Sequence, residues 1–152
     1  MSPMREEIVL SREELEQIDS RGMAAWDSHD AEAFADTFAE SFTLTDWSSP
    51  EPITTREAAI GYAQAWFTAF PDMSVKLNYR VVGEESVATV LTFKGTNTGV
   101  MFMAGKEIPP TGKSVEGQGC YTARIENGKV VEFHSMPDIA GMMMQLGFMP
   151  DM

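Results

Sequence analysis

The chain has 152 residues, a length that fits one domain with its own hydrophobic core. Its formal net charge of −12, from 23 acidic and 11 basic side chains, argues against nucleic acid or an anionic membrane as a partner, because phosphate groups would be repelled. We find no apolar run near the roughly 20 residues of a membrane span and no signal-peptide pattern. Cys120 is the only cysteine, which excludes an intrachain disulfide and favours a reducing, cytoplasmic setting.

A first helix is predicted shortly after the start of the chain. The segment Ser11-Arg12-Glu13-Glu14 is a capping box, in which a serine hydroxyl caps the first turn and a glutamate three residues later reaches back. Apolar residues then recur at helical spacing to about Ser28. We therefore expect residues 1–10 to form a flexible N-terminal arm and residues 11–149 to form a single domain.

Two further helices are predicted, each preceded by a residue that can cap its first turn. Asp30 can cap the second helix, which is predicted to continue past Phe38, because Phe34 and Phe38 would then lie on one helical face. Thr55 can cap the third helix, which is predicted over residues 56–70 and ends before a Pro-Asp pair. All three helices precede most of the predicted strands.

The remaining predicted elements are strands, over residues 42–46, 73–82, 85–98, 113–126 and 129–136. Asn127-Gly128 predicts a tight hairpin turn between the last two strands, because both central residues of such a turn need positive φ. Residues 99–112 are interpreted as a loop. Helices followed by a run of antiparallel strands indicate an α+β fold.

One strand indicates that the sheet is strongly curved. Along residues 113–126 one face is polar, while the other face is apolar and is interrupted by Gly117 and Gly119. Glycine inside a strand weakens it and permits a sharp bend. A curved sheet that wraps helices on its concave side would form a cone, and such a cone can keep an internal pocket open.

Candidate catalytic residues lie where the last predicted strand ends. Pro137 ends that strand because it has no N–H for a sheet ladder, and Asp138 follows at the N-cap of a short helix that stops at Gly147. His134 shares the strand parity of Asp138, and an acid near an imidazole suggests proton-transfer chemistry. The alternative is that Asp138 only caps the helix and that His134 is an ordinary core or pocket-wall residue.

Other residues are candidates for ligand contact. Asp46 ends the first predicted strand and could face the pocket mouth, or it could be a solvated strand end. Glu116 is a second acidic candidate, with an exposed strand face as its alternative. Some aromatic side chains must line any cavity, and their flat faces suit a planar ligand; these candidates are Trp26, Tyr62, Trp66 and Tyr121. The two histidines and one cysteine show no metal-site spacing, so we expect no metal and no cofactor.

Several short motifs match one known family. They are Trp26 with His29-Asp30, Phe70-Pro71-Asp72, Gly95-Thr96-Asn97-Thr98-Gly99, Pro110-Thr111-Gly112-Lys113, and Asp138 with Gln145-Leu146-Gly147. From about residue 15 to 147 the chain resembles the SnoaL-like polyketide cyclases (ester cyclases) of the nuclear-transport-factor-2-like (NTF2-like) superfamily. The resemblance implies an NTF2-like cone, with a curved antiparallel sheet packed on three N-terminal helices around an internal pocket. It also implies a homodimer through the outer face of the sheet.

The resemblance further implies a chemistry without metal or cofactor. In the characterised cyclases an aspartate near the C-terminal strand acts as acid–base in the intramolecular aldol closure of an aromatic polyketide ester, and Asp138 matches that aspartate. Asn97 stands where the family often has histidine, so it is a candidate substrate-binding residue that cannot carry a proton in the same way.

These observations give one leading hypothesis and two alternatives. The leading hypothesis is a cyclase or isomerase-type enzyme that removes a proton next to a carbonyl of a small hydrophobic molecule, with Asp138 as the base and His134 as a stabilising or relaying group. The first alternative is a non-catalytic module that binds a small apolar ligand. The second is an epoxide-hydrolase-like enzyme, which would need two aspartates bridged by an arginine around a water.

Overall fold

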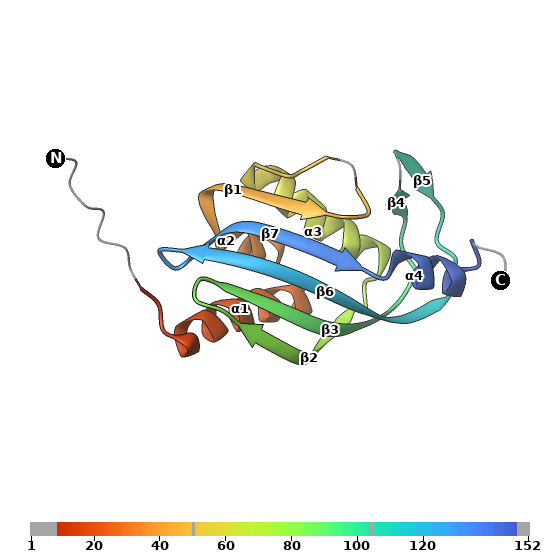
Figure 1. The fold of residues 1–152 in the computed structure, drawn as a ribbon. Helices are drawn as coiled ribbons and strands as arrows, with labels where there is room; N and C mark the ends of the chain where they lie inside the picture. The colour runs from red at the N-terminus through yellow and green to blue at the C-terminus, as the bar shows by residue number, and fades with distance from the viewer. Residues whose placement is uncertain (1–8, 50, 104, 149–152) are drawn as a thin grey trace.

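The computed structural model describes residues 9–49, 51–103 and 105–148, which form a curled sheet with helices against its inner side (Figure 1). The helices are α1 (Arg12–Asp27), α2 (Ala31–Asp36), α3 (Arg56–Ala69) and α4 (Ile139–Leu146). The strands are β1 (Phe38–Asp46), β2 (Ser74–Val82), β3 (Ser86–Thr96), β4 (Met101–Met103), β5 (Lys106–Ile108), β6 (Ser114–Glu126) and β7 (Lys129–Pro137). The expected arm over residues 1–10 lies almost wholly outside the described residues.

The predicted caps of the first three helices are confirmed. The hydroxyl of Ser11 accepts a hydrogen bond from the backbone N–H of Glu14 at 3.2 Å, and the Glu14 carboxylate accepts from the Ser11 N–H at 3.3 Å. Asp30 and Thr55 cap α2 and α3 in the same way, each through the N–H three residues further on. Each cap satisfies a backbone donor that has no partner inside its helix.

The second helix is shorter than predicted. The hydroxyl of Thr37 donates to the carbonyl of Phe34 at 2.7 Å, and the Thr37 carbonyl accepts from the N–H of Val130 on β7 at 2.9 Å. These bonds end α2 and bring the chain to the sheet, so Phe38 begins β1 instead of continuing the helix. The expected contact of Phe34 with Phe38 persists in another geometry, as an edge-to-face pair with ring centroids 5.2 Å apart.

Five strands form one sheet in the order β1-β7-β6-β3-β2. The predicted antiparallel pairing is confirmed for β2, β3, β6 and β7, whereas β1 joins the edge of β7 in parallel. Asn127 and Gly128 have φ values of 52° and 80°, which confirms the tight turn between β6 and β7. The segment interpreted as a loop contains a separate two-stranded hairpin, β4 with β5.

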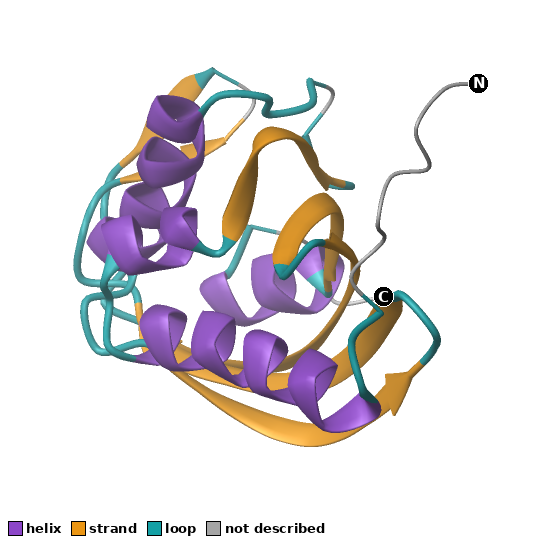
Figure 2. Ribbon diagram, turned by 90° about the vertical axis from the view of Figure 1, so that its left-hand side faces the viewer, coloured by secondary structure: helices purple, strands orange, loops and turns teal. Residues whose placement is uncertain are grey.

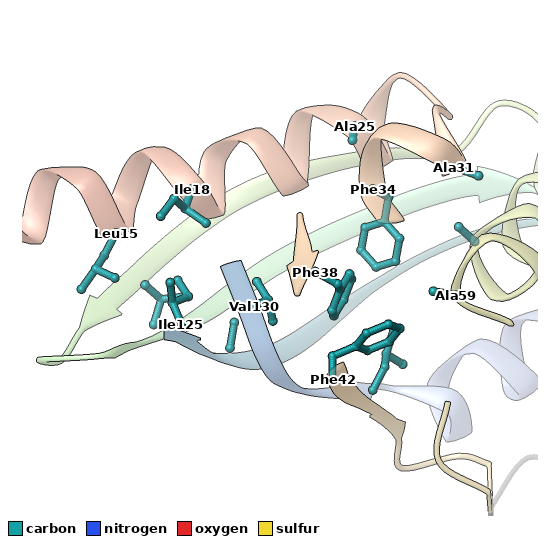
Figure 3. Packing of buried hydrophobic residues seen from close by; sticks show 14 of the residues in the cluster. Leu15, Ile18, Ala25, Ala31, Phe34, Phe38, Phe42, Ala59, Ile125 and Val130 are labelled. Carbon is teal, nitrogen blue, oxygen red and sulfur yellow. The ribbon is translucent and has the colours of Figure 1, made fainter. Parts of the chain in front are cut away.

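The concave face of the sheet is the apolar face predicted for residues 113–126, and Figure 2 shows how strongly the strands curl. Gly117 allows close packing, because a Cβ there would lie 2.8 Å from the ring of Phe93. Ile18 on α1 belongs to the same core cluster as Ile125 and Val130 on the sheet, and Figure 3 labels all three. This packing places α1, α2 and α3 inside the curve.

Two of the motifs that carry the family resemblance form a junction where α3 ends beside β3. The carboxylate of Asp72 accepts hydrogen bonds from the N–H of Thr96 at 2.6 Å and from its hydroxyl at 2.8 Å. The backbone bond above all lowers the pKa of Asp72. Gly99 lies so close to the carbonyl of Thr68 that a side chain there would collide with it. The junction fixes the end of α3 to the sheet.

Replacing Gly99 by alanine should destabilise the fold, because its Cβ would overlap the backbone of Thr68. We expect Gly99→Ala to lower the free energy of unfolding by about 3 kcal/mol, as overpacking does elsewhere. Gly61 in α3 is the matched control, since a Cβ there meets nothing within 4 Å and alanine favours a helix. Urea unfolding should show no loss for Gly61→Ala; an equal loss in both variants would contradict the close contact.

Candidate active site

A cavity of about 120 Å³ lies between the helices and the concave face of the sheet. Its lining is mostly apolar and includes the four predicted aromatic residues, Trp26, Tyr62, Trp66 and Tyr121. A cavity of about 150 Å³ in another protein holds benzene, so the space here suits a molecule of about one ring. It therefore has the character of a small-molecule site.

A row of polar side chains crosses the concave face from one edge of the sheet to the other. The strand register pairs Arg80 with Thr89, Thr89 with Tyr121, Tyr121 with Ser135, and Ser135 with Asp46. Partners in register lie on the same face of a sheet. We call these five residues the polar row. Because Tyr121 and Ser135 line the cavity, the row passes through its wall.

One end of the row forms the Tyr62 cluster, which we define as Tyr62, Trp66, Ser135 and Asp46. Asp46 is only 3% exposed, and its Oδ2 accepts from the Tyr62 hydroxyl at 2.6 Å. Its Oδ1 accepts from the N–H of Ser48 at 2.8 Å and from the Ser48 hydroxyl. Asp46 therefore lies behind the wall and not at the mouth. Burial, followed by the nearby Asp46 charge, raises the pKa of Tyr62, while Ser135 and Trp66 act in the opposite direction.

The other end forms the Asp19 cluster, which we define as Asp19, Arg80, Thr89 and Tyr121. Asp19 projects from α1, and its Oδ2 accepts from Arg80 Nε at 2.6 Å and from the Thr89 hydroxyl at 2.8 Å. Its Oδ1 accepts from the Tyr121 hydroxyl. Burial and then the Asp19 charge raise the pKa of Tyr121. Asp19 and Tyr121 line the cavity, yet Asp19 was not among the residues predicted from the sequence.

The structure does not place Asp138 in the apolar pocket, so that expectation is wrong. Asp138 is exposed, and its Oδ1 caps α4 by accepting from the N–H of Gly141 at 2.9 Å. The preceding residue, Pro137, does line the cavity. Asp138 thus follows a wall residue directly but turns its carboxylate to the helix end and to solvent.

His134 lies on the outer face of the sheet, which contradicts its expected place beside the pocket. The inward positions of β7 are its neighbours in the chain, including the cavity residue Ser135, because side chains alternate between the faces. The Nδ1 of His134 accepts from Trp47 Nε1 at 3.2 Å, and its Nε2 lies 3.6 Å from Oε1 of Glu132. The structure therefore separates His134 from every group in the cavity.

Asn97 is fully buried outside the cavity, where it fastens the β4–β5 segment to the end of α3. Its amide N–H groups donate to the carbonyls of Ala69 and Gly99, both at 3.0 Å. Its carbonyl accepts from the N–H of Thr111 at 2.9 Å and from the Thr111 hydroxyl at 3.0 Å. The amide is thus saturated within the protein, which corrects its expected contact with substrate.

Glu116 is also outside the cavity, because it lies on the polar, exposed face of β6. Its carboxylate lies 3.8 Å from the Nζ of Lys94 on the neighbouring strand. Its backbone N–H donates to the side chain of Gln145 at 2.8 Å, which holds α4 against the sheet. The expectation of a pocket role for Glu116 is wrong, and the exposed-strand alternative describes it.

A family model described as SnoaL-like polyketide cyclase matches residues 16–146. The chain belongs to this family. The match covers most of the chain and includes both clusters, and the structure has the NTF2-like cone that the family implies. A search among curated protein sequences finds no match.

Solved structures share the SnoaL-like fold over nearly the whole chain. AclR from Streptomyces galilaeus, a proposed hydroxylase, is 22% identical with a TM-score of 0.79, over 93% of this chain and 86% of its own. IdmH from Streptomyces antibioticus, a proposed polyketide cyclase, is 25% identical with a TM-score of 0.71, over 87% and 97%. SalBIII, an epoxide hydrolase/cyclase-like enzyme of pyran ring formation in salinomycin, is 17% identical with a TM-score of 0.70, over 85% and 94%. At identities this low, the structural similarity establishes a shared fold and not a shared activity.

Two kinds of feature are absent from the described residues. Among them, no group of three or more His, Cys, Asp or Glu side chains is arranged to hold a metal ion. None of the helices in the described segments has the length and apolar character that a membrane crossing requires.

The two cavity tyrosines should make the stability of this SnoaL-like domain fall in alkali. Their pKa values are raised in the folded chain, so they stay protonated when an unfolded tyrosine ionises near pH 10. Their contribution to the free energy of unfolding is complete below about pH 10. It is lost as the pH rises above that value, by about 1.4 kcal/mol per pH unit for each tyrosine. Urea unfolding at several alkaline pH values measures this slope.

The matched variants are Tyr121→Phe and Tyr79→Phe. Tyr121→Phe should make the free energy of unfolding fall less steeply above about pH 10, by about 1.4 kcal/mol per pH unit. Tyr79 is 60% exposed on the outer sheet face of the single chain, so Tyr79→Phe should leave the slope unchanged when it is measured at a dilution where the chain is monomeric. Equal slopes in the wild type and Tyr121→Phe would show that Tyr121 ionises in the folded protein.

Proposed function

We propose that this chain is a cofactor-independent cyclase of the SnoaL-like type that acts on a hydrophobic carbonyl compound held in the cavity. Membership in the family and the apolar lining support the proposal. The observation that carries it is the Tyr62 cluster, where the Tyr62 phenol on the cavity wall donates to the buried carboxylate of Asp46, and Ser135 and Trp66 line the same cavity. Such an arrangement can move a proton and stabilise an oxyanion.

The proposed reaction begins with removal of a proton from the carbon next to the carbonyl. The Tyr62 oxygen takes this proton as its own hydroxyl proton passes to Oδ2 of Asp46, 2.6 Å away. In our proposal Ser135 and Trp66, which line the same cavity, donate hydrogen bonds to the enolate oxygen. The enolate carbon attacks a second carbonyl carbon of the same molecule, and a carbon–carbon bond forms. The new alkoxide then takes the proton back through Tyr62, which gives an aldol-type ring closure.

Two aspartates compete for the role of acid–base. Asp138 has the position in the chain that the family resemblance implies, but it is exposed and caps α4. Asp46 is buried and is connected to the cavity through the Tyr62 hydroxyl. A buried base acts without competition from water, so the geometry favours Asp46 in our proposal.

The size of the cavity limits what binds without movement. About 120 Å³ accommodates one ring, and a longer carbonyl chain needs more room. Met23 and Met73 line the cavity, and methionine side chains adapt easily because three bonds rotate. We propose that larger substrates enter by displacement of these side chains.

The two alternatives find less support in the geometry. A purely binding module would use the same cavity but would not need the hydroxyl-to-carboxylate connection of Tyr62 with Asp46. An epoxide-hydrolase-like site would need one arginine between two aspartates. Arg80 pairs with Asp19 at one end of the polar row, whereas Asp46 lies at the other end.

Deuterium exchange into a simple ketone tests the proton-transfer step. We use 2-indanone in D₂O as the probe and follow loss of its α-proton signals by NMR. The wild-type chain should accelerate exchange over buffer, and Asp46→Asn and Tyr62→Phe should each slow it by about 10²-fold, the typical contribution of a positioned acid–base. Asp138→Asn should retain the rate.

The variants also define the contrary outcomes. A 10²-fold loss in Asp138→Asn with normal exchange in Asp46→Asn would move the base to Asp138. No acceleration by the wild type, although 2-indanone binds, would favour the binding module. Circular dichroism of each variant checks that the fold is kept.

We also propose that two copies pair through the outer face of the sheet. Tyr79 and Val81 on β2 are 60% and 58% exposed, and Val90 and Met136 lie half-buried on the same face. Among the described residues the helices pack on the inner side, so this apolar strip stays open (Figure 1). A stable interface needs about 800 Å² from each partner, which a sheet face can supply.

Sedimentation equilibrium tests the pairing. We expect a dimer at micromolar concentration and a shift to monomer in Tyr79→Glu, because the new charge would be buried without a partner. Phe102→Ser is the control, since Phe102 is exposed on the separate β4–β5 hairpin. A monomeric wild type, or a Phe102→Ser variant that dissociates instead, would remove this interface.

A further inference from the structure

The Asp19 cluster has a feature that anchoring a helix does not require. Arg80 and Thr89 would be enough to pair the Asp19 carboxylate, and neither of them lines the cavity. Tyr121 nevertheless brings a third donor to Asp19 from the cavity wall, and Asp19 itself borders the cavity. A buried polar cluster gains little stability over a well-packed apolar one, so its place on the wall calls for another role.

Both hydroxyl protons of the cluster are used inside the protein, and Arg80 does not line the cavity. Arg80 Nε and the Thr89 hydroxyl donate to Oδ2 of Asp19, and the Tyr121 hydroxyl donates to Oδ1. A phenol has one proton to donate, so Tyr121 can offer only oxygen lone pairs to a molecule in the cavity. This end of the polar row therefore accepts hydrogen bonds and cannot donate them to a ligand.

The neighbouring strand offers the opposite chemistry. Ser135 is the direct register partner of Tyr121, and it lines the cavity together with Tyr62 and Trp66, so a hydroxyl and an indole N–H that can donate lie at this end. A donor end and an acceptor end thus adjoin in an otherwise apolar wall. A molecule that satisfies both ends carries a carbonyl on the side next to α3 and a hydroxyl on the side next to α1.

We propose that Tyr121, held by Asp19, is a specificity-determining residue that accepts a hydrogen bond from a phenol or enol hydroxyl of the ligand. The inference rests on the proposed function in that it concerns the same cavity, and it narrows the ligand class to hydroxylated carbonyl compounds. A ligand without the hydroxyl leaves the Tyr121 acceptor unpaired and loses affinity. Asp19 acts through Tyr121 and is a positioning residue.

The test compares p-cresol with 4-fluorotoluene, which has nearly the same shape but no hydroxyl donor. NMR titrations of the full chain measure both affinities. The wild type should prefer p-cresol by about tenfold, the value of one well-made hydrogen bond. Tyr121→Phe should reduce the preference to about twofold and leave the affinity for 4-fluorotoluene unchanged, since the ring stays in place.

Two controls separate this site from its neighbours. Thr89→Val removes a donor to Asp19 without touching the cavity, and it should keep the preference. Tyr62→Phe alters the other cluster and should also keep it. Loss of the preference in Tyr62→Phe, or its persistence in Tyr121→Phe, overturns the proposal and leaves the proposed cyclase function intact. Binding of neither probe to the wild type overturns the cavity as a ligand site, and this proposal with it.

A direct measurement covers the case in which Tyr121→Phe does not fold. Nuclear Overhauser effects from bound p-cresol to the wild-type protein report which phenol lies beside the ligand hydroxyl. Contacts from the ring protons next to that hydroxyl to the ring of Tyr121 support the site. Contacts to Tyr62 alone overturn it.

Discussion

The pairing of buried polar groups is the constraint on which the rest of this structure depends. One row of the concave face carries polar side chains in all five strands of the sheet, and none of them can be left without a partner under a layer of helices. The helices supply the partners, Asp19 from α1 and Tyr62 from α3. The bonds that fix these helices to the sheet therefore also build the polar parts of the cavity wall.

Sequence reasoning succeeded where local chemistry decides the structure. The capping residues, the Asn127-Gly128 turn and the alternation along β6 each depend on a few neighbouring residues, and all three were confirmed. The helix predicted past Phe38 was wrong because a bond from Val130, about ninety positions further along the chain, draws that segment into the sheet. Local pattern cannot report a partner so distant.

The site was harder to predict, because the alternation of side chains along a strand shows which residues share a face but not which face points into the fold. His134 and Asp138 were expected at the pocket on grounds of parity, yet His134 lies on the outer face and Asp138 caps α4 beyond the end of β7. The motif residue Asn97 was read as a substrate contact, although its amide holds a loop in place. The sequence did contain a signal for Asp19. It follows Leu15 by one helical turn on the apolar side of α1, and a carboxylate is rarely buried there without a partner.

The two tyrosine–aspartate pairs explain how an acidic chain keeps a neutral cavity. The chain has a net charge of −12, and the carboxylate of Asp19 borders the cavity while that of Asp46 lies behind its wall, but each accepts a hydrogen bond from a phenol that borders the space. At one end a ligand meets the Tyr62 hydroxyl with Asp46 behind it, and at the other end the charge of Asp19 is already paired with Arg80 and the Tyr121 hydroxyl. An apolar molecule can then bind without facing an unpaired ion, whose burial would be costly.

The Tyr62–Asp46 pair also supplies the base of the proposed reaction. As the proton passes through Tyr62 to Asp46, the negative charge of the carboxylate is neutralised at the moment when the enolate becomes negative, so the cavity gains no net charge. The Asp19 pair differs because Arg80 forms an ion pair with its carboxylate at 2.6 Å, which makes Asp19 a fixed support for Tyr121. Arg80 thus distinguishes two otherwise similar pairs, which is why we propose proton transfer at the Asp46 end of the row and ligand recognition at the Asp19 end.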